Sequence, residues 1–101
     1  MADQQQQGQR QIQIKITDEV MKGVPSNMMA VSHSREEFVL DFMNIIPPQG
    51  QGIVTSRVVV TPGHMKRIVA ALKENIERYE KQFGKIANTP SPQDEIGFRV
   101  V

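Results

Sequence analysis

Several residue types are absent or scarce in this chain of 101 residues. It has no cysteine, which excludes disulfides and thiolate metal sites. It has no tryptophan, and its aromatic residues are one tyrosine and four phenylalanines, few for a protein that stacks nucleobases. No apolar run approaches the roughly 20 residues of a membrane span, and the start MADQQQQGQRQ lacks the apolar core of a signal peptide. We therefore expect a soluble cytoplasmic protein.

An excess of charge of one sign is also missing. The 12 basic and 11 acidic residues nearly cancel, so no overall field attracts the protein to nucleic acid or to an anionic membrane. The length suits one domain with a modest core. We predict a disordered, glutamine-rich lead-in over residues 1–10, a single α+β domain over 11–86, and a mobile tail over 87–101 that could add a strand.

Apolar alternation predicts four strands. In QIQIKIT, from residue 11, the isoleucines fall on one face and the polar residues on the other, the pattern of a half-buried strand. Residues 27–33 and 38–45 read as a hairpin that turns near Ser34 and Arg35. The segment PPQGQG interrupts the sheet pattern, and IVTSRVVVT follows as the fourth strand.

A helix is predicted directly after the fourth strand. Thr61 is a good N-cap residue, Pro62 suits the first helical position, and Gly84 suits the C-terminal end. Between them, apolar residues recur at spacings of three and four, which indicates an amphipathic helix of about five turns. They are Met65, Ile68, Val69, Leu72, Ile76, Tyr79 and Phe83.

These elements predict an α+β fold: a four-stranded antiparallel sheet followed by one long C-terminal amphipathic helix packed on one face. We expect Leu72, Ile76 and Tyr79 to cover that face. The opposite face is also apolar, and a monomer rarely leaves so large an apolar surface in water. The sequence therefore predicts a homodimer or higher oligomer whose interface contains Met29, Val31, Val39, Met43, Ile45 and Val59.

Residues that could carry chemistry are few. His64 lies in the first helical turn, and we interpret it as a residue beside the cap rather than a catalytic base. His33 lies beside the hairpin turn, and two isolated histidines make a weak metal site. Asp41 lies on the outward parity between Val39 and Met43, so we expect it either to face a partner or to pair with Arg57 across the adjoining strand. We predict no catalytic, metal-binding or cofactor-binding residues, and hence no enzyme.

The only basic grouping joins one strand residue to three helix residues: Arg57, Lys66, Arg67 and Lys73. The simplest interpretation is a solvated face with ordinary helix ion pairs. The functional alternative is a track of phosphate contacts for single-stranded nucleic acid. Apolar surfaces that contain methionine can also adapt to varied partners, so a peptide-binding chaperone similar to SecB stays open.

Three stretches carry a resemblance to a known family: SREEFVLDFMNI, SRVVVTPGHMKR and ALKENIERYEKQFG. Together they resemble a family of small uncharacterised bacterial, archaeal and phage proteins, a domain of unknown function. The resemblance covers roughly residues 11 to 86 and implies a stand-alone domain, but no catalytic residue, cofactor or substrate. Our leading hypothesis is a non-enzymatic homo-oligomeric binding or scaffold protein, with no membrane partner. A single-stranded nucleic-acid binder and a SecB-like peptide-binding chaperone are the alternatives.

Overall fold

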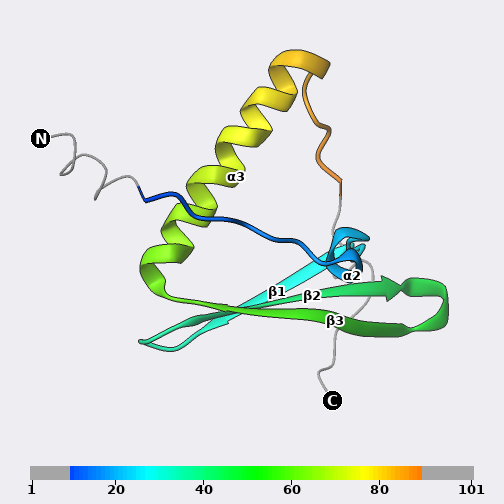
Figure 1. Ribbon diagram of the computed structural model, residues 1–101. Coiled ribbons are helices and arrows are strands. Elements are labelled where there is room, and N and C mark those ends of the chain that lie inside the picture. Colours follow the sequence, from blue (N-terminus) through cyan, green and yellow to red (C-terminus); the bar gives the residue numbers. More distant parts are fainter. Residues whose placement is uncertain (1–9, 90–101) are drawn as a thin grey trace, which may run out of the picture.

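The computed structural model describes residues 10–89 and shows an antiparallel sheet with a long helix rising from one end of it (Figure 1). The elements follow in the order α2 (Asp18–Met21), β1 (Met28–His33), β2 (Phe38–Ile46), η1 (Pro47–Gln49), β3 (Gln51–Val60) and α3 (Pro62–Phe83). This arrangement confirms an α+β fold with an antiparallel sheet and a long C-terminal helix. The predicted lead-in lies almost wholly outside the described residues, as does most of the predicted tail.

The sheet has three strands in the order β1-β2-β3. Val31 and Val58 lie opposite Leu40, and Ser32 and Val59 lie opposite Val39, from either side of the central strand. The predicted hairpin is confirmed: in its turn the Ser34 amide donates to the Glu37 carbonyl oxygen at 2.9 Å. All three buried apolar residues of the described chain lie in β2 and β3, namely Leu40, Ile45 and Val60.

Asn27 fastens the chain before β1 to the far end of β2. The side-chain nitrogen Nδ2 of Asn27 donates to the carbonyl oxygen of Ile45 at 2.8 Å. The backbone amide of Ile45 donates back to the Asn27 Oδ1, also at 2.8 Å. Beside this pair, Asn44 Nδ2 donates to the carbonyl oxygen of Pro25 at 2.7 Å. A side-chain amide thus reproduces the exchange of hydrogen bonds between paired strands, which no periodicity in the sequence reveals.

The segment PPQGQG connects β2 to β3, and its last two residues already belong to β3. Pro47–Gln49 form a short 3-10 helix, and Gly50 has a positive φ of 65°. Contrary to the prediction, Gln51 and Gly52 are part of β3. A register shift between Phe42 and Met43 places Val54 opposite Met43, so Thr55 is the extra residue of a bulge.

Both ends of α3 lie where capping chemistry predicts them. The hydroxyl of Thr61 accepts from the His64 amide at 3.3 Å, and Pro62 begins the helix. Gly84 ends it with a φ of 98°, a conformation that L side chains rarely adopt. His64 therefore has a structural place at the helix start, through its backbone.

Two predictions about the architecture are wrong for this chain. Residues 11–17 form no strand, because nothing in the described chain pairs with them, so the sheet has three strands rather than four. The helix α3 does not lie across the sheet: it rises away from it, and none of its residues is buried (Figure 1). Alternation and amphipathicity specify an apolar side but do not say what covers it.

Candidate functional site

The most prominent surface feature is a row of exposed apolar side chains along α3. We call it the helix stripe, and it consists of Val69, Leu72, Ile76, Tyr79 and Phe83. Its members follow one another at spacings of three, four, three and four residues, the spacing of a helix that packs against another element along its length. Leu72 is 60% exposed and Phe83 is 66% exposed. The sequence predicted the stripe but assigned part of it to the wrong place, the protein's own core.

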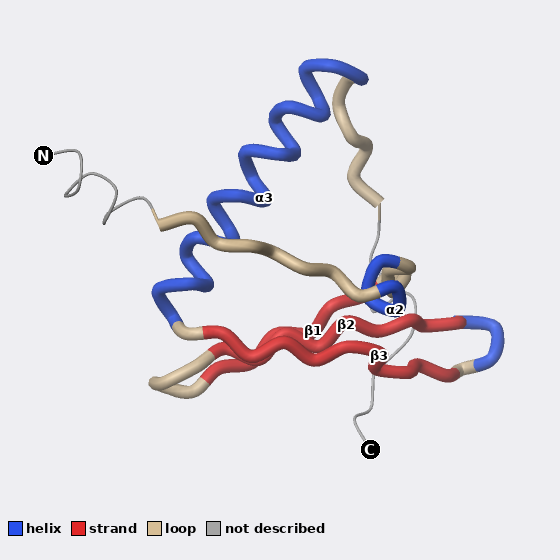
Figure 2. Tube along the Cα trace, viewed as in Figure 1, coloured by secondary structure: helices blue, strands red, loops and turns tan. Residues whose placement is uncertain are grey.

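A second exposed apolar feature precedes α2. Residues 11–16, here called the Ile segment, are irregular chain that leads toward α2 and lies apart from the sheet (Figure 2). Its three isoleucines are exposed, and Ile14 is 91% exposed. Within residues 10–89, the backbone groups of this segment form no hydrogen bond with another backbone group. The Ile segment keeps the alternation of a strand without a partner strand.

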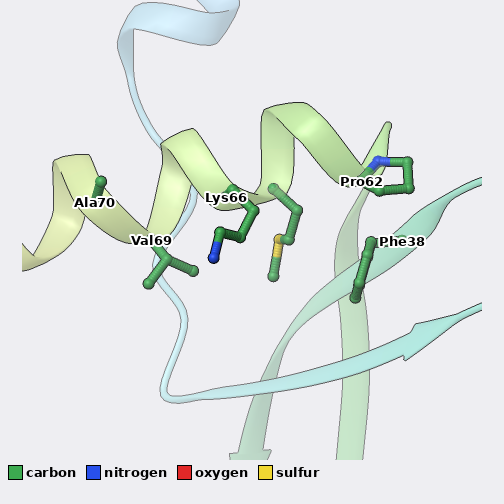
Figure 3. A pocket seen from close by; sticks show the side chains of 6 residues that line it. Phe38, Pro62, Lys66, Val69 and Ala70 are labelled. Carbon is green, nitrogen blue, oxygen red and sulfur yellow. The ribbon is translucent and has the colours of Figure 1, made fainter.

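Where α3 leaves the sheet, an open pocket of about 500 Å³ lies between the first helical turns and β2 (Figure 3). Lys66 and Val69 extend from the helix on the side that faces Phe38. The lining is mostly apolar, and it consists of Phe38, Pro62, Met65, Lys66, Val69 and Ala70. The pocket continues the exposed apolar surface from the helix stripe to the sheet.

The six residues predicted as an oligomer interface do not share one face of the sheet. The register places Met29 and Val31 opposite Phe42 and Leu40, on the other side from Val39, Met43 and Val59. The prediction of a shared face is therefore wrong, because the parity assumed for the first hairpin strand was shifted by one residue. Ile45 is buried within the chain. Met29, Val31 and Val59 are exposed, and Val39 and Met43 are half-buried.

The predicted pair of Asp41 and Arg57 is confirmed. The two residues are direct cross-strand neighbours, and the guanidinium donates to both carboxylate oxygens, at 2.7 and 2.8 Å. Their side chains differ in exposure, 18% for Asp41 and 65% for Arg57. The hydrogen bonds from Arg57 hold the pKa of Asp41 below its ordinary value of 3.8, and its positive charge adds to this effect. The same pairing raises the pKa of Arg57.

This pairing separates Arg57 from the other predicted nucleic-acid contacts. Lys66, Arg67 and Lys73 all lie on α3, whereas the Arg57 guanidinium is occupied on the sheet. Among the described residues, none of the three helix cations forms an ion pair; on α3, Arg78 pairs with Glu74 instead. The structure thus divides the predicted basic grouping into Arg57, which is paired with Asp41 on the sheet, and three residues on α3.

The two histidines lie in different surroundings. The His33 ring lies 5.4 Å from the Phe38 ring, centre to centre, at the hairpin end of the sheet. His64 is exposed at the start of α3. Within residues 10–89, no group of three or more histidine, aspartate or glutamate side chains is placed to hold a metal ion. Over the same residues, no helix has the length and apolar character to cross a membrane.

Together these features describe a small α+β domain whose sheet contains a cross-strand ion pair and whose helix α3 and Ile segment expose regularly spaced apolar side chains. Residues 1–88 match the family described as Protein of unknown function (DUF3467), and the chain belongs to that family. No curated protein and no solved structure matches the chain.

Proposed function

We propose that the protein is a non-enzymatic homo-oligomeric binding or scaffold protein whose subunits cover each other's helix stripe. The observation that supports this most directly is the exposure of all five stripe residues on a helix that buries none of its own. A long amphipathic helix obtains most of its stability from burying its apolar face. A second copy of the chain provides such burial, and a two-fold arrangement lets both helices gain it equally.

The exposed apolar area is of the size that a dimer requires. Burying a large apolar side chain contributes about 1.5–3 kcal/mol, which at about 25 cal/mol per Å² corresponds to about 60–120 Å². The helix stripe and the three isoleucines of the Ile segment are all half exposed or more. On that scale they offer about 300–600 Å² per chain. A standard interface buries about 800 Å² per partner, a little more than half of it apolar.

Analytical ultracentrifugation at tens of micromolar protein tests the proposal. We expect a dimer or higher closed oligomer for the natural sequence. The Leu72→Glu variant should be monomeric, because it places a charge in the centre of the stripe. Ala71→Glu is the matched control: it adds the same charge one residue earlier, outside the stripe, and should leave the oligomer intact. A natural chain that sediments as a monomer would overturn the proposal.

A second candidate function is single-stranded nucleic-acid binding by α3. It is favoured by the three helix cations, which no described carboxylate neutralises. Fluorescence anisotropy of a labelled single-stranded oligonucleotide, at low and moderate salt, tests it. Binding that weakens with salt, and weakens further in Lys66→Gln with Lys73→Gln, would support the candidate. Arg57→Gln is the comparison variant, since its guanidinium is already held by Asp41. No binding at low salt would exclude this candidate.

A further inference from the structure

The Ile segment has the properties of a strand that lacks a neighbour. Its isoleucines at 12, 14 and 16 would lie on one side of a pleated strand, with Gln13 and Lys15 on the other. All are exposed, and no backbone hydrogen bond within the described chain holds the segment. A strand with one apolar side is stabilised when it joins a sheet whose edge has the same pattern.

Within the part of the chain that the structure describes, no strand pairs with the outer edge of β1 over residues 29–33. This strand pairs with β2 on one side and lies at the end of the three-stranded order. Natural edge strands are commonly protected by charged residues, proline or a bulge. From Met29 to His33 the strand contains no lysine, arginine, acidic residue or proline. The other edge, β3, has Arg57 and the bulge at Thr55.

The two sides of β1 match the two sides of the Ile segment. Met29 and Val31 are exposed on the side of the sheet that carries Leu40 and Phe42, and they would extend an apolar row to the isoleucines. Ala30 and Ser32 lie on the opposite side, where small residues leave room for Gln13 and Lys15. An added strand beside β3 would instead place Lys15 on the side of Val59 and the positively charged Arg57.

We infer that the Ile segment of one protomer adds to the outer edge of β1 in a second copy, along residues 29–33, so that each sheet gains a fourth strand. This inference rests on the proposed homo-oligomer. The occupant is a second copy because, in its own chain, the segment lies apart from the sheet, pairs with no described strand and stays exposed (Figure 2). Extended, the six residues of the segment span about 20 Å, which is enough to run along residues 29–33 of β1. A two-fold exchange satisfies both segments at once.

Hydrogen exchange followed by mass spectrometry on the full-length oligomer tests the inference. We expect amides of residues 11–16 and 29–33 to exchange at least about tenfold more slowly than in the Leu72→Glu monomer. Ile14→Pro removes an amide and interrupts the strand, so it should abolish the protection at both segments; Ile14→Val, the matched control, should retain it. The segment is exposed in the protomer, so neither change should unfold the sheet.

The outcomes distinguish the two proposals. A monomer in the ultracentrifuge overturns both the oligomer and the strand addition. An oligomer in which residues 11–16 exchange as fast as in the monomer overturns the strand addition and leaves the oligomer standing.

Cross-linking between chains identifies which sheet edge the Ile segment joins. Because the natural chain has no cysteine, only the introduced thiols can react. Isotope-labelled Gln13→Cys chains are mixed with unlabelled Ala30→Cys chains, and the thiols are joined by a flexible bismaleimide. Gln13 and Ala30 are central in their segments, so we expect a covalent product containing one chain of each mass. Thr55→Cys on the β3 edge is the control and should link much less. Preferential linking to Thr55, or no linking to Ala30, would overturn the assignment to β1.

Discussion

The small core of the sheet and the two elements that flank it differ in how their apolar side chains are covered. In the sheet, Leu40 and Val60 are buried within the chain. The turn and the two hydrogen bonds between the Asn27 side chain and the Ile45 backbone, here called the Asn27 clamp, satisfy polar backbone groups. In α3 and the Ile segment, the apolar side chains are as regularly spaced but remain exposed. Regular spacing therefore does not show that a surface is buried within one chain. It shows only that some surface should cover it.

The largest difference between the two regions should appear when one leucine from each is truncated. Leu40→Ala should lower the free energy of unfolding by about 2–5 kcal/mol, because it leaves a cavity in the small core. Leu72→Ala should have little effect in dilute monomer and a larger one when the protein is oligomeric. Chemical denaturation at several protein concentrations measures both. Equal, concentration-independent losses would mean that Leu72 is buried within its own chain.

The next largest effect on stability should come from removing the Asn27 clamp at the far end of β2. Asn27→Ala removes both hydrogen bonds with the Ile45 backbone, and leaving such partly buried groups unpaired costs about 1–3 kcal/mol. Ser26→Ala is a suitable comparison, because the Ser26 hydroxyl is exposed and bonds only to carbonyl oxygens. Urea denaturation should show a clearly larger loss for Asn27→Ala. Similar losses would contradict a specific role for the clamp.

The start of α3 should be less sensitive. Thr61→Ala removes the hydroxyl that accepts from the His64 amide and should cost about 0.5–2 kcal/mol. Thr61→Ser retains the hydroxyl and should stay close to the natural protein. His64→Ala should also change stability little, since the bond uses the His64 backbone. A large loss from His64→Ala, measured by thermal unfolding, would show that its side chain has a role of its own.

The smallest expected effect is the acid dependence of the pair between Asp41 and Arg57. The pKa of Asp41 is below 3.8 in the folded chain, so the pair contributes stability above the unfolded pKa. That contribution is lost as the pH falls through the folded pKa. Thermal unfolding from about pH 6 to about pH 2 should therefore show a smaller acid-induced loss in Asp41→Asn and in Arg57→Gln than in the natural protein. An unchanged acid limb in both variants would contradict this account.

Particular residues show how far prediction from the sequence reached. Parity left two placements open for Asp41, and the structure shows the pairing with Arg57; the family was identified from three stretches of sequence. The six predicted interface residues lie on two faces because the parity assumed for β1 was shifted by one residue. Such a shift moves every side chain of the strand to the other face. Asn27 was missed because a side chain that pairs with a strand's backbone leaves no periodic pattern.

The sequence by itself determined the hairpin of β1 and β2, the presence of β3 and both ends of α3. Those features depend on interactions between residues close along the chain: alternation, turn-forming residues, an N-cap threonine and a glycine with positive φ. Only the tertiary structure decided that Leu72 and Ile14 are exposed while Leu40 and Ile45 are buried. The physical reason is that burial depends on which surfaces meet in space, and the hydrophobic effect that drives it has no direction.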